Sequence, residues 1–135
     1  MAKSKQTPLS GFSREIHLIL DDYADDVADR VGQVVERITK SGAKRVQAAA
    51  RAKFPVPGSR HKSTGAYAKG WKARVDKKGR TVQGVIYNKD LPGLPHLLEH
   101  GHANVNGGRT PGYVHIKPVE DALKAEFEKA VKEEL

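Results

Sequence analysis

Two histidines and a glutamate form a short string in this sequence that matches a catalytic pattern. His96, Glu99 and His100 have the spacing His-x-x-Glu-His, in which two histidines on a helix bind Zn²⁺ and the glutamate acts as a base. Pro95 and Gly101 flank the string, which leaves about one helical turn to fix both ligands. The nearby candidates for a third ligand, none with a familiar spacing, are His102, His115 and Glu120. A zinc-dependent hydrolase is therefore the weakest functional hypothesis, and we expect no metal.

Two glycine-containing segments suggest other chemistry but lack the residues that it needs. Gly107-Gly108-Arg109 has neither the glycine spacing nor the Lys-Ser/Thr or acidic residue of phosphate-binding and dinucleotide-binding loops. Ser63-Thr64-Gly65 has no nucleophile-elbow pattern and no base that can be placed beside it. The sequence predicts no catalytic residue and no cofactor, and we expect that the protein is not an enzyme.

Acidic residues gather in residues 21–29, where they could suggest a calcium site. The five aspartates are Asp21, Asp22, Asp25, Asp26 and Asp29. Calcium loops of the EF-hand type alternate oxygen ligands around a central glycine, whereas these aspartates have helical spacing. We interpret them as a solvated helix face.

Basic residues are concentrated in the middle of a chain whose formal net charge is +8. Lys40 to Arg80 hold 13 Lys or Arg and one Asp. With Phe54, Tyr67 and Trp71, this segment could contact phosphates and stack on bases, although Trp71 fits better in the core. A basic nucleic-acid-binding module is thus the alternative hypothesis. The candidate DNA-facing or interaction residues are Arg60, Lys62, Lys72, Arg74, Lys77, Lys78, Arg80 and Arg109.

Apolar spacing predicts the helices that must position these residues. Steps of four and three predict a long amphipathic helix through Phe12, Ile16, Leu20, Tyr23, Val27, Val31, Val34 and Ile38. At Ser41-Gly42 this helix either bends or gives way to a second one, which Pro55 and Pro57 end. Leu91 to His100 predicts one or two helical turns, and Pro118 opens a last amphipathic helix.

Alternating residues predict the strands. Residues 71–75 and 82–87 form a β-hairpin around a turn at 77–80, and Gly84 suggests a bulge. Tyr113, Val114 and Ile116 suggest a third strand. We therefore predict an α+β fold, in which a long N-terminal amphipathic helix and a C-terminal helix pack on one face of a small, mostly antiparallel sheet of three or four strands.

The whole chain, residues 1–135, is expected to form a single domain, with residues 1–10 flexible and loops at 55–65 and 103–112. The sequence has no cysteine and no apolar run that suits a signal peptide or a membrane span, so we expect no disulfide and no membrane contact. The first helix looks longer than so small a sheet can cover, which favours a homo-oligomer.

Ordered motifs give a resemblance to a known family. Tyr87-Asn88-Lys89, Leu97 to His102, Gly107-Gly108-Arg109 and His115 to Pro118 follow one another as in a bacteriophage tail-component family of long-tailed phages. Upstream, Ala52 to Pro55 and Ser63 to Tyr67 also resemble that family, so the likeness covers roughly residues 43–130. The motif residues expected to be structural are Thr64, Gly65, Tyr87, Asn88, Leu97, Leu98, Glu99, Gly101, His102, Gly107, Gly108, His115 and Pro118.

The resemblance implies a structural virion protein that acts in tail completion or head-tail joining as a ring-forming component. It implies other neck and tail proteins as partners, a place in the tail or at the head-tail junction, and a stage in the host cytoplasm during assembly. It brings no enzymatic activity, metal or cofactor. Basic residues in the lumen of such a ring could contact DNA without reading its sequence.

Overall fold

The computed structural model describes residues 14–54 and 65–135. In chain order its elements are β1 (Ile16–Asp21), the 3-10 turn η1 (Asp25–Val27), α1 (Ala28–Lys53), α2 (Ala66–Lys69), β2 (Trp71–Lys78), β3 (Thr81–Asn88), α3 (Leu94–His100), β4 (His102–Ala103), β5 (Arg109–Thr110) and α4 (Lys117–Glu134). The segment 1–10, expected to be flexible, and nearly all of the expected loop 55–65 lie outside the described residues. Arg60, Lys62 and Thr64 also lie outside them.

A three-stranded antiparallel sheet forms one layer of the molecule, with the strand order β1-β3-β2. β2 and β3 form the predicted hairpin, paired from Trp71 opposite Asn88 to Lys78 opposite Thr81. β1 pairs with β3 over all six of its residues. β1 and β2 are therefore the two edges of the sheet.

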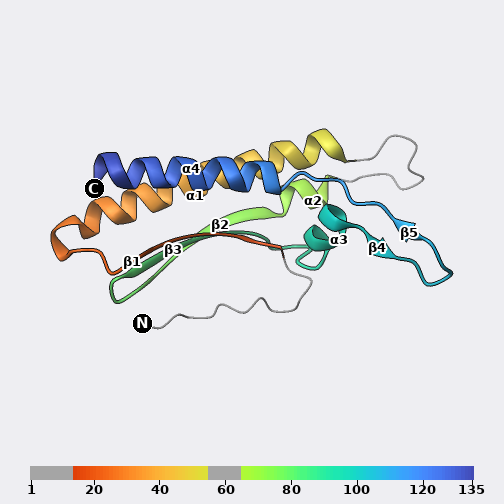
Figure 1. The fold of residues 1–135 in the computed structure, drawn as a ribbon, viewed down its shortest axis with the longest axis horizontal. Helices are drawn as coiled ribbons and strands as arrows, with labels where there is room; N and C mark the ends of the chain where they lie inside the picture. The colour runs from red at the N-terminus through yellow and green to blue at the C-terminus, as the bar shows by residue number, and fades with distance from the viewer. Residues whose placement is uncertain (1–13, 55–64) are drawn as a thin grey trace.

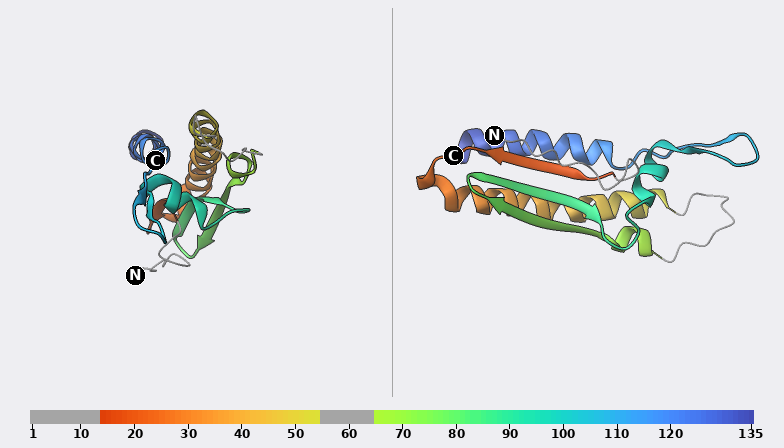
Figure 2. Two further views of the ribbon diagram at one scale, coloured as in Figure 1. Left: turned by 90° about the vertical axis from the view of Figure 1, so that its right-hand side faces the viewer. Right: turned by 90° about the horizontal axis from the view of Figure 1, so that it is seen from below.

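The long helices α1 and α4 lie side by side along one face of this sheet, and within the described residues no helix covers the other face (Figure 1, Figure 2). The core lies between the two layers. Its fully buried aliphatic residues include Val31, Val35 and Val46 of α1, Ile86 of β3 and Leu123 of α4. Burial of each such side chain stabilises the fold by about 1.5–3 kcal/mol. This arrangement confirms the predicted α+β class.

The first described element is a strand, so the prediction of a helix from residue 12 onward is wrong for residues 16–24. Residues 25–27 form the 3-10 turn η1, and the α-helix begins at Ala28. Ile16 and Leu20 are four residues apart, and this spacing fits a helical stripe as well as a strand in which alternate residues face the core. Leu18 distinguishes the two patterns, because it is 2% exposed and lies on the core face beside Ile16. Pairing with β3 supplies the backbone hydrogen bonds, so tertiary contacts select the strand.

The predicted third strand at 113–116 is also wrong, since the third strand of the sheet is β1. Tyr113, Val114 and Ile116 belong to the segment between β5 and α4. The backbone N–H of Tyr113 donates to the carbonyl oxygen of Leu98 at 2.7 Å, and Ile116 is fully buried. This segment therefore attaches α4 to α3.

Two glycines allow the layers to approach closely. α1 passes through Ser41-Gly42 without a break. A Cβ on Gly42 would lie 2.5 Å from Leu123 Cδ1 and 2.6 Å from Ile86 Cδ1, so a larger residue would force these buried side chains to shift. Gly84 keeps regular pairing in both ladders, so the predicted bulge is wrong. A Cβ there would overlap Thr39 Oγ1, which explains the glycine.

The five aspartates do not share one helix, contrary to the prediction. Asp21 ends β1, Asp22 has a left-handed backbone with φ 54°, Asp25 and Asp26 lie in η1, and Asp29 alone is in α1. All five are exposed, in agreement with the interpretation as solvated residues.

Beyond the end of the sheet lie α3 and a small hairpin. α3 confirms the predicted short helix, and Gly101 follows it with φ 79°. Within the expected loop 103–112 the structure has a short antiparallel pair, β4 and β5, which projects from the body (Figure 1, Figure 2). None of the helices that the structure describes combines the length and apolarity that crossing a bilayer requires.

Candidate functional site

Three of the eight candidate basic residues form one exposed row on the sheet. In β2 alternate residues face opposite sides, so Lys72, Arg74 and Lys78 lie on the face away from the helices. The guanidinium of Arg74 lies 5.1 Å from the centroid of the Tyr87 ring and pairs with Asp76 at 3.0 Å. This outward row is the basic surface that the structure assembles.

The other described candidates point elsewhere. Lys77 lies on the helix side of the sheet, with its Nζ close to Gly32 of α1. Arg80, in the turn after β2, pairs with Asp25 at 3.3 Å. Arg109, on β5, donates to a backbone carbonyl oxygen of α3 at 2.9 Å. The structure therefore does not join these three residues to the β2 row.

The opposite edge of the same face carries acidic groups that the sequence analysis did not single out as a set. Glu15 precedes β1 and Asp21 ends it, with His17 and Ile19 between them. His17 Nε2 lies 3.0 Å from Glu15 Oε1, Thr81 Oγ1 donates to Asp21, and Ile19 is 49% exposed. The signal that could have revealed this row is its alternation with Ile16, Leu18 and Leu20, which the helical interpretation concealed.

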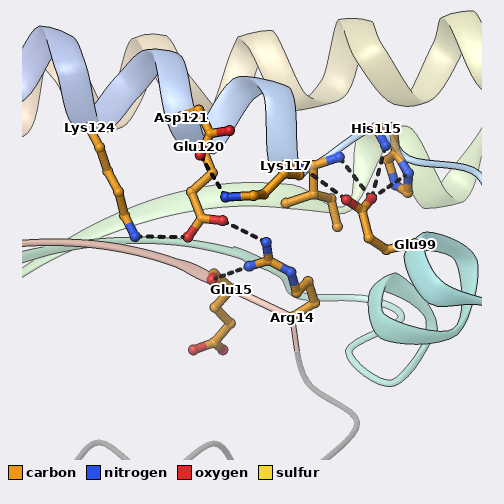
Figure 3. A network of polar contacts seen from close by, with 9 residues as sticks. Arg14, Glu15, Glu99, His115, Lys117, Glu120, Asp121 and Lys124 are labelled. Carbon is orange, nitrogen blue, oxygen red and sulfur yellow. Dashed lines mark hydrogen bonds and ion pairs between the residues drawn. The ribbon is translucent and has the colours of Figure 1, made fainter.

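The candidate zinc residues do not converge on one point, although Glu99 and His115 are in contact. The rings of His96 and His100 lie 4.9 Å apart on α3, but Glu99 points toward the start of α4 (Figure 3). His102 is exposed on β4, and Glu120 is held in an ion pair on α4. Across residues 14–54 and 65–135, no three His, Asp or Glu side chains gather so that they could hold a metal ion.

Glu99 is a buried carboxylate that holds the N-terminus of α4. It accepts hydrogen bonds from the backbone N–H groups of His115, Ile116 and Lys117, each at 2.9 Å (Figure 3). α4 has no side-chain cap of its own, so a carboxylate from α3 supplies the negative charge that a helix N-terminus favours. Burial alone would raise the pKa of Glu99, but bonds from the His115 side chain and these N–H groups lower it to about 2. So weak a base is suited to structure rather than to proton transfer.

Tyr67 and His115 extend this network into the core. Tyr67 Oη lies 2.5 Å from His115 Nε2, while His115 Nδ1 lies 2.8 Å from the carbonyl oxygen of Tyr113 and 3.1 Å from Glu99 Oε1. Both of those oxygens accept, so in the neutral ring Nδ1 carries the proton and the Tyr67 hydroxyl donates to Nε2. Burial raises the pKa of Tyr67. Phe54, after α1, packs edge-on against the Tyr67 and His115 rings, so the cluster joins α1, α2 and the approach to α4.

A second ion-pair cluster attaches the start of β1 to α4. Arg14 and Lys124 pair with Glu120 at 2.6 Å and 3.2 Å (Figure 3). Burial would raise the pKa of Glu120, but the two cations outweigh it and lower the pKa. Arg14 could not be singled out from the sequence, because its partner lies 106 residues away and no local pattern links them.

The residues of the family motifs form turns and joints. Asn88 donates to the carbonyl oxygen of Tyr67 at 2.8 Å and accepts from the N–H of Leu91 at 2.9 Å, so it joins α2 to the end of β3. A Cβ on Gly101 would lie 2.7 Å from the backbone nitrogen of Gly112, so glycine permits the close approach of two chain segments. The remaining motif residues lie at turns with positive φ (Gly65, Gly107, Gly108), half-buried on α3 and β3 (Leu97, Leu98, Tyr87) and in the first turn of α4 (Pro118).

Comparison with known proteins identifies the family. Residues 20–101 match the family described as "Bacteriophage HK97-gp10, putative tail-component". The matched region runs from the end of β1 through α1, the β2-β3 hairpin and α3, and the motifs at 107–109 and 115–118 lie beyond it. No match was found among curated proteins or among solved structures. Since the family match covers more than half of the chain and agrees with the resemblance in the motifs, this protein belongs to the HK97-gp10-like family of bacteriophage tail components.

Proposed function

We propose that this protein is a structural part of a tailed phage particle, which acts in tail completion or head-tail joining as a homo-oligomeric ring. The observation that carries the proposal is the family match over residues 20–101. Its partners are neighbouring copies and other neck and tail proteins. Its place is the tail or the head-tail junction of the virion, after a stage of assembly in the host cytoplasm.

The geometry supports an assembly role in two ways. The glutamate of the string with catalytic spacing serves the fold, because its carboxylate accepts hydrogen bonds from three backbone N–H groups at the start of α4. The β4-β5 hairpin projects from the body, and Val105 near its tip is fully exposed (Figure 2). An exposed apolar side chain on a projecting hairpin is suited to insertion into a partner.

The test is the morphology of particles made by a phage that lacks this gene. Electron micrographs should show filled heads with separate or aberrant tails, and the wild-type gene supplied in trans should restore joined particles. Complementation with Val105→Asp should fail, whereas Ala125→Asp, at an exposed position of α4, should succeed as the matched control. Normal infectious particles without the gene would refute the proposal.

A nucleic-acid contact is the second candidate, and the row formed by Lys72, Arg74 and Lys78 is the observation that favours it. Three phosphate contacts give a slope of about −2.7 in a plot of log affinity for duplex DNA against log salt. Reversal of these three charges should abolish salt-dependent retention of DNA. The control is reversal of three exposed lysines of the helices, namely Lys44, Lys129 and Lys132. Equal loss in both variants would show only a response to net charge.

A further inference from the structure

We infer that neighbouring copies join edge to edge, with β1 of one copy beside β2 of the next, so that their sheets form one continuous surface. This inference rests on the proposed function, because it specifies how the subunits of the ring meet. The occupant of each sheet edge is therefore a second copy of this chain.

Both edges are available and have compatible directions. Within the described residues β1 and β2 each pair only with β3, so the outer side of each has unpaired backbone groups of the kind that bind another strand. Both are antiparallel to β3 and hence parallel to each other. Rotation about the axis of a ring preserves strand direction, so β1 would meet the next β2 as a parallel neighbour.

The strand β3 pairs with both edge strands, so it shows which residues of β1 and β2 lie at the same height along the strands. Thr81 pairs with Asp21 on one side and with Lys78 on the other, so these two residues lie at the same level. Tyr87 pairs with Lys72, and Glu15 reaches that level one residue before the first pair of β1. When neighbouring copies are not shifted relative to each other along the strands, which we call the level register, Asp21 therefore meets Lys78 of the next copy. Glu15 then meets Lys72 of that copy.

The two edges are complementary on both faces of the sheet. The contact between β1 of one copy and β2 of the next is called the seam. On its outward face each end joins an acid, Glu15 or Asp21, to a lysine of β2. Lys72 and Lys78 have no ion-pair partner among the described residues, so both are available to a neighbour. On the helix side Gly84 pairs with Leu18 and with Val75, so these apolar residues lie at one level and extend the core across the seam. Opposite charges and apolar groups that are level on adjacent strands attract one another.

The charge pattern also favours contact of a β1 edge with a β2 edge over contact between two identical edges. Two β2 edges would bring basic rows together, which is how natural sheets prevent association of identical strands. A slip of two residues in one direction would place Asp21 beside Asp76, and a slip in the other would pair Glu15 with Arg74. In the level register both Glu15 and Asp21 meet a lysine of the next copy.

Ordinary packing distances suggest which layer faces the lumen of a ring. Three strands span about 14 Å and two packed helices span about 20 Å, so each copy is expected to be wider on its helix side. Subunits that are wider on the helix side form a closed ring with the helices on the outside and the sheet on the inside. The row formed by Lys72, Arg74 and Lys78 would then face the lumen.

Disulfide trapping can test the seam, because the sequence has no cysteine. Within one chain positions 15 and 72 are separated by two strand spacings, about 10 Å, whereas a disulfide requires Cα atoms within about 7 Å. Across the seam they are one spacing apart, about 5 Å. The double variant Glu15→Cys/Lys72→Cys, supplied to phage lacking the gene, should form a ladder of linked copies on a non-reducing gel of oxidised particles. Asp21→Cys/Lys78→Cys should give the same ladder and is the second variant.

Controls separate this arrangement from other contacts. Glu15→Cys/Lys78→Cys joins opposite ends of the seam and should stay monomeric. A ladder from Glu15→Cys/Arg74→Cys but not from the two level pairs would overturn the level register, and a dimer from Ile19→Cys alone would indicate β1-β1 pairing instead. Monomers from both level pairs in infectious particles that contain the protein would overturn the inference and leave the proposed function intact. Absence of the wild-type protein from particles would overturn both.

Discussion

Replacement of Glu99 by glutamine keeps the size of a buried side chain and removes its negative charge. A pKa lowered from 4.5 to about 2 corresponds to about 3 kcal/mol of stability from the ionised carboxylate. The contacts give a similar figure: three hydrogen bonds to a charged acceptor contribute about 1.5–3 kcal/mol each, and desolvation of the carboxylate offsets several kcal/mol. We predict that Glu99→Gln lowers the free energy of unfolding at neutral pH by about 2–3 kcal/mol.

The effect has a defined pH dependence. Because the folded pKa of Glu99 lies below its ordinary value of 4.5, its contribution is complete well above pH 4.5 and is lost as the pH falls toward about 2. Urea unfolding followed by circular dichroism should therefore show a constant gap between wild type and Glu99→Gln above about pH 6, which narrows below about pH 4. The control is Glu126→Gln, whose half-exposed carboxylate pairs with Arg45 at 2.7 Å and should change stability by less than about 1 kcal/mol. A gap that stays constant down to pH 3, or an equal loss in the control, would refute the assignment.

Three further predictions concern stability measured by the same urea titration. Gly42→Ala should destabilise by about 1–3 kcal/mol through overpacking, whereas Gly32→Ala in the same helix meets only the flexible end of Lys77 and should stabilise by up to about 1 kcal/mol; the opposite order would contradict the close packing. Gly84→Ala should destabilise by about 1–3 kcal/mol without changing the circular dichroism spectrum. An unchanged urea midpoint would show that α1 can move away from the sheet at no cost, against the close packing described above. Tyr67→Phe removes the hydroxyl bonded to His115 and should cost about 1 kcal/mol, so a gain in stability would count against this hydrogen bond.

Segments whose pattern is set by local contacts could be predicted from the sequence. The β2-β3 hairpin follows from alternating residues on either side of a glycine turn, and α4 follows from its apolar stripe and Pro118. Each of these elements buries one face, so the period of its apolar residues reports its structure. α1 likewise follows from its stripe beyond residue 28.

Features that depend on distant partners could not be predicted in this way. The strand β1 exists because it pairs with β3, and Ile16 lies opposite Ile86, 70 residues further along the chain. Its apolar spacing is compatible with two periods, and nothing local selects between them. Glu99 had catalytic spacing in the sequence, but its partners are mainly backbone N–H groups, which leave no mark on residue types.

The amount and location of this protein in purified phage particles test the central claim most directly. Quantitative mass spectrometry of infectious particles, and of heads and tails separated from them, should find the protein in a fixed ratio to the major tail protein. It should remain with the tail or the head-tail junction after separation. Infectious particles that lack the protein would contradict its assignment as a structural component of the virion.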